Sequence, residues 1–288
     1  MTKESKIGFG VIGVLVAALV VGYFGGRWGG SSSSGKAAGG GGTDVSVATW
    51  INKIKASKQL RVGCADSPPT TVVSANVCSG PDLIPLQELA TEMGVKMVPV
   101  TTTFQSMVAG LQADRWDVAA NLDQTVQRGL AIQFSNPSWS YPGVFVLPKS
   151  TPLKTAAEIQ KAGKPVATSQ GTALDAALQS AKYPELRVDT YENATAALQS
   201  GRASSVFTDL GTAENIVAKN LNFGILIPNP PLFVHHVAYG LPAGIDPRSL
   251  QIVNIAVDNA VASGEIDRAF SAAGYKQPGD LGGMQIQP

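Results

Sequence analysis

Short apolar runs alternate with amphipathic segments along most of the chain. In the first half, three runs have the length and composition of strands: Leu60–Cys64, Lys96–Val100 and Trp116–Ala120. Between them, apolar residues recur at helical spacing in the segments 85–93 and 104–111. Pro85 suits the first turn of a helix and Gly94 suits its end. The pattern predicts a sheet flanked by helices.

A second series of the same kind follows residue 143. We expect strands at 144–147, 165–168, 186–190 and 205–208, and helices at 156–162, 172–181, 194–200 and 212–219. The last segments, 247–263 and 265–273, have helical spacing and no strand partner of their own, so they should pack on the first group of elements. The chain is therefore predicted to form two α/β lobes joined by two crossings, near 140–143 and 236–240.

An apolar stretch of twenty uncharged residues, Ile7–Gly26, follows Lys3 and Lys6 near the start of the chain. As a helix it would span roughly 30 Å, which matches the hydrocarbon core of a bilayer. A cleaved secretory signal is the other interpretation, but its apolar core is usually about 7–15 residues and small residues follow it. Bulky residues follow here, ending with Trp28. We prefer an uncleaved anchor, and both interpretations export the rest of the chain.

The next residues have the composition of a flexible linker. Residues 29–42 contain seven glycines and four serines. Gly30–Lys36 imitates a phosphate-binding loop, but Ala37 stands where a serine or threonine is needed, and no strand leads into the segment. The predicted parts of the chain are an N-terminal anchor or signal at 1–28, the linker at 29–43, the first part of lobe 1 at 44–142, lobe 2 at 143–237, and the return to lobe 1 at 238–288.

Composition limits the kinds of molecule that the protein is expected to bind. Charged residues make up 15% of the chain and the net charge is +1, so there is no basic surplus for nucleic acid. His235 and His236 are the only histidines, and neighbours on a strand point to opposite faces, so they cannot share one metal ion. Sequence motifs of zinc proteases, serine hydrolases and cysteine–histidine nucleophiles do not occur. We expect neither a cofactor nor a metal.

The densest group of polar side chains follows the third predicted strand. Asn121, Asp123, Thr125 and Arg128 lie within eight residues. A guanidinium group can bind a carboxylate through two parallel hydrogen bonds, and the neighbouring amide, hydroxyl and carboxylate groups suit an ammonium. The group therefore favours a zwitterion such as a free amino acid. A polar loop with one surface ion pair fits the same residues.

Two further candidates lie where strands of the second series end. Gly171 and Thr172 stand between a strand and a helix, where free backbone N–H groups attract an anion. Asp209 ends the apolar strand 205–208, and a carboxylate there is costly unless it is paired. Both Thr172 and Asp209 also suit the ordinary role of a helix cap. Ligands of such sheets bind outside the carboxyl ends of the strands, which places these residues and Arg128 at one predicted site.

These motifs, in this order, resemble the polar amino-acid solute-binding proteins of ABC uptake systems. The resemblance covers about residues 57–276 and rests on T-x-x-R…FS-x-P at 125–137, Gln170-Gly171-Thr172, Val206–Asp209 and Val237–Pro242. It implies the two-lobed type II fold of periplasmic binding proteins, an α/β fold with a ligand cleft between the lobes. In that family, the residues that match Arg128 and Thr172 hold the ligand's α-carboxylate, and the aspartate that matches Asp209 binds its α-ammonium.

The chain departs from the family pattern at two places. Asp123 stands where members usually have a serine or threonine, and a carboxylate there would strengthen ammonium binding or repel an acidic ligand. The loop 66–71 lacks the tyrosine or phenylalanine that stacks on the ligand side chain. Phe104 is a candidate wall residue, although its helical spacing also suits the core. Trp139 and Tyr141 either line the cleft or pack beside the crossing.

Cys64 and Cys78 are the only cysteines. In an exported protein such a pair is a disulfide candidate. The alternative is two buried thiols whose Cα atoms lie too far apart to be bridged. The sequence leaves both interpretations open.

Sequence and resemblance together predict a monomer that captures a free amino acid and delivers it to the permease of an ABC importer. It would lie on the periplasmic or extracellular side of the cytoplasmic membrane, held there by its N-terminal helix. Two alternatives stay open. One is an enzyme on the same scaffold, such as a cyclohexadienyl dehydratase-like lyase with Asp123 or Glu192 as general acid. The other is a ligand-sensing domain.

Overall fold

A computed structural model describes residues 47–75 and 77–276 of the chain. These residues belong to one compact unit that begins at Asp44. The predicted membrane anchor and the whole predicted linker lie outside the described residues. Within the described ranges, no helix is both long enough and apolar enough to cross a bilayer.

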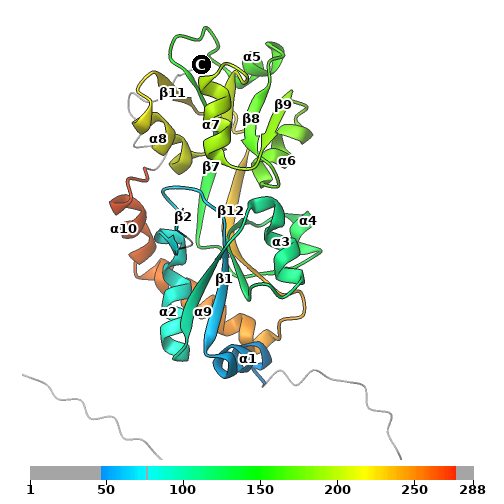
Figure 1. Ribbon diagram of the computed structural model, residues 1–288, viewed down its shortest axis with the longest axis vertical. Coiled ribbons are helices and arrows are strands. Elements are labelled where there is room, and N and C mark those ends of the chain that lie inside the picture. The colour runs from blue at the N-terminus through cyan, green and yellow to red at the C-terminus, as the bar shows by residue number, and fades with distance from the viewer. Residues whose placement is uncertain (1–46, 76, 277–288) are drawn as a thin grey trace, which may run out of the picture. The chain divides into compact units, whose positions relative to one another are not determined.

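Lobe 1 is built on a sheet with the strand order β4-β1-β5-β12. Its elements are α1 (Thr49–Ser57), β1 (Gln59–Cys64), α2 (Ile84–Met93), β4 (Lys96–Thr101), α3 (Phe104–Gln112), β5 (Val118–Asp123), α4 (Val126–Gly129), β6 (Gln133–Phe134), β12 (Val234–Leu241), α9 (Pro247–Ala262) and α10 (Glu265–Ala272) (Figure 1). β1 pairs in parallel with β4 and β5, and β12 runs antiparallel to β5. Between β1 and α2 lie the hairpin of β2 (Val72–Ser74) and β3 (Val77–Ser79) and the short helix η1 (Pro81–Leu83).

Lobe 2 is built on strands in the order β7-β10-β8-β9, with β11 paired to the other side of β7. Its elements are α5 (Ala156–Lys161), β8 (Val166–Ser169), α6 (Ala173–Ser180), β9 (Glu185–Val188), α7 (Tyr191–Gln199), β10 (Ser205–Asp209), α8 (Leu210–Lys219) and β11 (Phe223–Leu226) (Figure 1). β8 pairs in parallel with β9 and β10. Each lobe has its own core of buried apolar side chains.

The strand β7 (Trp139–Pro148) belongs to both lobes. Its residues 139–142 pair with β12 in lobe 1, whereas residues 143–146 pair with β10 in lobe 2. The chain therefore passes from one lobe to the other inside a continuous strand, near the crossing expected at 140–143. β12 starts beside this stretch of β7 and continues along β5.

Side-chain caps set several helix starts in lobe 2. Thr155, Thr172, Thr190 and Asp209 each accept a hydrogen bond from the backbone N–H three residues later. The predicted strand at 186–190 therefore ends earlier, at Val188, because Thr190 already caps α7. The predicted alternation of strands and helices is confirmed. The hairpin β2–β3, η1 and β11 were not predicted. The helix α9, which follows β12, packs on α2, as expected for the return to lobe 1.

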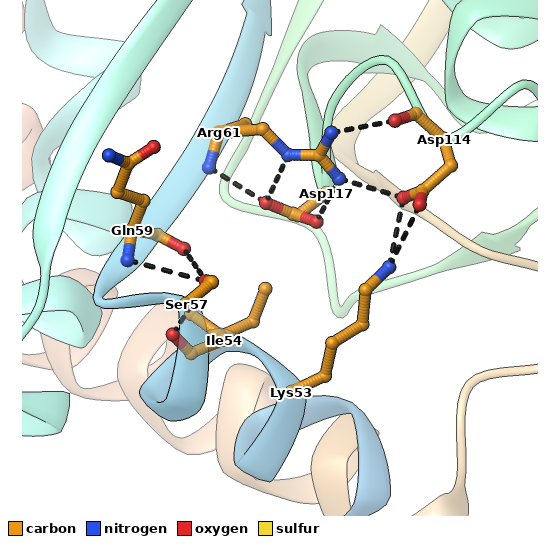
Figure 2. Close-up of polar contacts among 7 residues, drawn as sticks. All are labelled: Lys53, Ile54, Ser57, Gln59, Arg61, Asp114 and Asp117. Carbon is orange, nitrogen blue, oxygen red and sulfur yellow. Dashed lines mark hydrogen bonds and ion pairs between the residues drawn. The ribbon is translucent and has the colours of Figure 1, made fainter.

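A cluster of charges lies toward the amino ends of β1 and β5, at the end of the sheet opposite the predicted ligand site (Figure 2). Arg61 binds both carboxylate oxygens of Asp117, through Nε at 3.0 Å and Nη2 at 2.7 Å. It also binds Asp114 at 2.7 Å, and Lys53 of α1 binds Asp114 at 2.9 Å. The Asp117 side chain is 3% exposed and that of Asp114 is 64% exposed. The cluster thus joins one buried carboxylate and one solvated carboxylate to the same arginine.

Candidate functional site

One cavity is lined by side chains from both lobes. Its lining residues are Ser67, Phe104, Asn121, Asp123, Trp139, Tyr141, Thr172, Leu174, Tyr191 and Asp209. Its volume is about 20 Å³, room for about one water molecule, so a larger ligand has to enter while the walls are further apart. Five of the seven predicted ligand-binding residues line this cavity. The side chain of Arg128 and the backbone of Gly171 lie beside it and contact each other.

The end of β5 contributes Asn121 and Asp123. The backbone of Asn121 has φ +56°, an uncommon conformation for a residue other than glycine, and its side-chain amide donates to Thr70 Oγ1 at 3.2 Å. Asp123 is 7% exposed and accepts a hydrogen bond from the hydroxyl of Tyr141 at 2.7 Å. Burial raises the pKa of the Asp123 carboxyl, while the charge of Arg128 and the bond from Tyr141 act in the opposite direction.

Arg128 connects the two lobes. Its backbone N–H is bonded to the side chain of Thr125, which caps the short helix α4. Its guanidinium donates to the carbonyl oxygen of Asp123 at 3.0 Å and to that of Gly171 in lobe 2 at 2.9 Å. One carboxylate oxygen of Asp123 lies 3.7 Å from the same group. The arginine therefore reaches lobe 2 through a backbone carbonyl, which is a neutral acceptor.

The loop before α6 presents Gly171 and Thr172 to that arginine. Gly171 has φ +78°, and a Cβ there would lie 2.5 Å from the backbone of Gln105 in lobe 1, so the close approach requires glycine. Its N–H donates to Asp175 at 2.8 Å, and Arg187 holds the same carboxylate. Thr172 caps α6 by accepting from the N–H of Asp175 at 3.1 Å. The cap interpretation of Thr172 is thus correct, and the residue lines the cavity as well.

Asp209 also combines two roles. One carboxylate oxygen accepts from the N–H of Thr212 at 2.8 Å, which caps α8, and the other accepts from the hydroxyl of Thr208 at 3.3 Å. The side chain is 5% exposed and lines the cavity. Burial raises the pKa of the Asp209 carboxyl, and the charge of Asp123 acts in the same direction. Two buried carboxylates, one from each lobe, therefore line the same small cavity.

Aromatic side chains supply most of the remaining wall. Trp139 and Tyr141 of β7 line the cavity, with ring centroids 5.3 Å apart, and Phe104 of α3 joins them. Tyr191, Ser67 and Leu174 were not among the predicted site residues. Tyr191 follows the capping residue of α7 and is apolar enough to look like core, so the sequence carries no signal for its place in the cavity. Burial raises the pKa of the Tyr191 hydroxyl, so it stays protonated and can donate.

Further polar contacts link the lobes. Ser67 and Thr212 hydroxyls lie 3.1 Å apart, and Gln170 donates to Gln105 at 2.7 Å. Beyond α10, the N–H of Lys276 donates to Glu214 of α8 at 2.8 Å. The sequence predicted two crossings between the lobes, and this C-terminal contact is a third connection.

A larger cavity, about 680 Å³, lies beside α8 and β11. Lys149, Glu214, Phe223 and Lys276 are among its lining residues. None of the predicted site residues lines it, and it lacks the facing carboxylates of the smaller cavity. Ligand sites in such folds are marked by convergent polar groups at the carboxyl ends of strands, so volume alone does not make this cavity the functional site.

The histidines and the described acidic residues do not form a metal site. His235 stacks on Phe233 with ring centroids 4.3 Å apart, and its Nδ1 lies 3.2 Å from the carbonyl oxygen of Gln124. His236 is exposed. Among residues 47–75 and 77–276, no group of three or more histidine, cysteine, aspartate or glutamate side chains is arranged to hold a metal ion.

The structure shows Cys64 on β1 and Cys78 on β3 as free, buried thiols, without the disulfide that the sequence allowed. Of the two interpretations that the sequence left open, two buried thiols without a bridge is the one that the structure shows. The neighbouring Cys78 thiol and burial raise the pKa of the Cys64 thiol. Burial in an apolar core makes such thiols unreactive.

We expect thiol titration to count no accessible thiol in the native protein and two after denaturation without reductant. The physical reason is that both groups are reduced and covered by the lobe 1 core. A count of zero after denaturation would instead show a disulfide. Such a bond would close a short loop, and its reduction should then cost about 3 kcal/mol.

Comparison with known proteins shows to which family the chain belongs. The chain matches the family of bacterial extracellular solute-binding proteins, family 3, over residues 60–272. The ABC transporter arginine-binding protein 1 of Escherichia coli (strain K12) is 25% identical over 224 residues, covering 75% of this chain and 88% of that protein. The arginine-bound form of truncated ArgBP from T. maritima is 26% identical, with a TM-score of 0.66 over 72% of this chain and 99% of that chain.

An ancestral amino acid-binding protein, a precursor of cyclohexadienyl dehydratase, is 24% identical with a TM-score of 0.66, covering 77% of this chain and 97% of that chain. At this identity the likeness shows the fold alone. The two-lobed α/β fold and the resemblance read from the motifs around Arg128, Thr172 and Asp209 are confirmed. The chain belongs to the bacterial extracellular solute-binding proteins, family 3.

Proposed function

We propose that the protein captures a free amino acid in the cavity between its lobes and delivers it to the permease of an ABC importer. The observation that carries the proposal is the meeting of Asp123 from lobe 1 and Asp209 from lobe 2 in one buried cavity. A ligand ammonium between the two carboxylates would compensate charge that burial makes costly. Relatives named for binding arginine and histidine are consistent with a ligand that carries positive charge.

The ligand's α-carboxylate would bind on the Arg128 side of the cavity. There the guanidinium now donates to the carbonyl oxygen of Gly171, and a carboxylate is a stronger acceptor than a carbonyl. The hydroxyl of Thr172 and the N-terminus of α6 would complete the anion site. Because both lobes then hold the same ligand, binding would favour the conformation in which the lobes contact each other.

The same proposal assigns roles to the rest of the chain. Residues 1–28 would anchor the protein on the outer side of the cytoplasmic membrane, and residues 29–43 would tether the binding unit. Lobe 1 would comprise 44–142 and 238–288, and lobe 2 would comprise 143–237. We infer that a monomer is sufficient, since both lobes of one chain line the cavity.

An enzyme on this scaffold has less support. Of the two proposed general acids, Glu192 is exposed and lines a different pocket, together with Asp66 and Lys219. Asp123 does line the cavity, but Tyr141 and Arg128 already contact its carboxylate. We infer that the protein binds its ligand without converting it. Formation of a product from prephenate or arogenate would favour the enzyme instead.

The ammonium contact is tested with Asp209→Asn and two ligands, arginine and its 2-hydroxy analogue. If Asp209 accepts from the ammonium, the variant places amide donors where an acceptor is needed, and arginine should bind more weakly by about 2–5 kcal/mol. The hydroxy analogue should lose far less. Calorimetry with both ligands and both proteins measures the difference.

Asp246→Asn is the matched control for this experiment. Asp246 caps α9 by accepting from the N–H of Ser249 at 2.8 Å, in the same way that Asp209 caps α8, but it does not line the cavity. Its substitution should change stability by about 1 kcal/mol and leave both affinities unchanged. An equal loss of affinity for the amine and the hydroxy ligand in Asp209→Asn would rule out the ammonium contact.

A further inference from the structure

Asp82 is a buried carboxyl group that the proposed ligand contacts do not use. It lies in η1, between the β2–β3 hairpin and α2, and is 1% exposed. Its Oδ1 accepts a hydrogen bond from the indole N–H of Trp139 at 3.1 Å. Its Oδ2 has no hydrogen-bond partner among the described residues. Its backbone carbonyl oxygen accepts from the hydroxyl of Tyr239 on β12 at 2.7 Å, which fixes the residue in place.

The hydrogen-bond partner of the Asp82 side chain belongs to the wall of the ligand cavity. Trp139 lines the cavity and packs against Tyr141, Phe270 and Tyr275, with ring centroids 5.3, 4.8 and 5.8 Å away. Apolar packing restricts the position of the Trp139 indole ring. The hydrogen bond to Asp82 also fixes its orientation, because the edge that carries the N–H must face the carboxyl group. The backbone N–H of Asn121, another lining residue, also acts to lower the pKa of the Asp82 carboxyl.

We propose that Asp82 is a positioning residue of the ligand cavity, which holds the indole of Trp139 in the cavity wall from the side away from the cavity. The effect on binding rests on the proposed function, whereas the link between Asp82 and Trp139 does not. Asp82 itself does not line the cavity, so it would act on a ligand through Trp139.

Within residues 47–75 and 77–276, no cationic side chain forms an ion pair with Asp82. The titratable groups that interact with it are the hydroxyl of Tyr239 and the thiol of Cys64, whose pKa values lie above their ordinary ranges, so both are neutral at physiological pH. The charged residues of the helices packed beside η1 are at least partly exposed: Glu88, Glu92, Glu265, Asp267 and Arg268. On β5, also beside η1, the acidic residue is Asp123, and Asp117 just before that strand is bound to Arg61.

Burial therefore raises the pKa of the Asp82 carboxyl to about 7, although the indole N–H of Trp139 and the backbone N–H of Asn121 act in the opposite direction. Below that pH the group is neutral. Above it the group is an anion, which accepts the indole hydrogen bond more strongly. The wall should thus be held more firmly, and a cationic ligand bound more tightly, as the pH rises through about 7.

The indole N–H resonance of Trp139 tests this link directly. The protein has four tryptophans, and the resonance missing from Trp139→Phe identifies the one that matters. In the ligand-free wild type we expect this resonance to move between pH 5.5 and 8.5 with a midpoint near 7. Asp82→Asn keeps an acceptor but cannot ionise, so its Trp139 resonance should stay fixed. Asp123→Asn and Asp209→Asn should leave the movement in place.

The affinity for arginine tests whether Asp82 affects ligand binding. Asp82→Asn should weaken binding by about fivefold at pH 8 and leave it unchanged at pH 5.5, because the neutral acid and the amide accept alike. In a Trp139→Phe background the substitution should have no further effect. Equal affinities at pH 8, or the same loss with and without the Trp139 indole, would overturn the positioning role.

The outcomes separate the two proposals. A Trp139 resonance that does not move in the wild type, or that still moves in Asp82→Asn, overturns the link to Asp82. If Asp82→Asn does not fold, loss of the movement in Asp123→Asn or Asp209→Asn overturns it, because the titrating group would then lie in the cavity. If the protein binds no arginine or other amino acid, the proposed function fails, and the resonance still decides about Asp82.

Discussion

Arg128→Lys should weaken amino-acid binding by about 2–4 kcal/mol while the protein remains folded. Lysine keeps the charge but has no planar fork, so it cannot hold a carboxylate by two parallel bonds. It also cannot reach the carbonyl oxygens of Asp123 and Gly171 together, which the guanidinium now joins across the lobes. Calorimetry with arginine measures the affinity, and thermal unfolding checks the fold.

Arg115→Lys is the matched control, because Arg115 is an exposed arginine of lobe 1 outside the cavity. Its affinity should equal that of the wild type. The sharper variant is Arg128→Ala, which removes the group completely. Unchanged affinity in folded Arg128→Ala protein would contradict the assignment of Arg128 to the carboxylate, whatever the effect of lysine.

The largest loss of stability is expected from Arg61→Ala, at about 3 kcal/mol and up to about 5. The substitution leaves Asp117, which is 3% exposed, without the guanidinium that binds both its oxygens (Figure 2). A buried carboxylate without a partner is costly, and this cost exceeds the value of the ion pair itself. Denaturant unfolding of the wild type and the variant measures the difference.

Lys53→Ala removes a neighbouring ion pair of nearly the same length from the same cluster. Lys53 and Asp114 are 55% and 64% exposed, so water solvates both charges when the pair is broken. The expected loss is therefore below about 1 kcal/mol. Similar losses for Arg61→Ala and Lys53→Ala would show that burial of Asp117 does not decide the energetics of the cluster. Neither variant should change ligand affinity, because the cluster lies at the other end of the sheet.

The fold could be predicted from the sequence wherever one physical pattern dominated. The strands predicted at 60–64, 116–120 and 205–208 overlap β1, β5 and β10, which are largely buried runs, although β5 starts and ends later than predicted and includes Asn121 and Asp123. The helices between them carry apolar residues at helical spacing. The hairpin β2–β3 escaped prediction because its strands have three residues each and only Cys78 among them is buried. The end of β9 was placed too late because a threonine suits both a strand and a helix cap.

The candidate site was predictable where a polar residue stands at the end of an apolar strand. Asn121, Asp123, Thr172 and Asp209 all gave this signal, and the structure brings them to one cavity. Tyr191 gave none, because an aromatic residue at the start of a helix usually belongs to the core. Asp82 was missed for a related reason. An aspartate before a helix suggests a solvated first turn, and only the tertiary fold reveals that Trp139 covers it.

The shared strand β7 has a consequence for the order in which the protein can be assembled. All pairing partners within the lobe 2 sheet come from the continuous stretch 143–226, so this sheet can be completed as soon as that stretch has left the ribosome or the translocation channel. Lobe 1 begins earlier but finishes later, because β12 fills the gap between β5 and β7 and α9 covers α2. Its first strands must wait through about a hundred residues of synthesis with one edge unpaired, a state prone to aggregation.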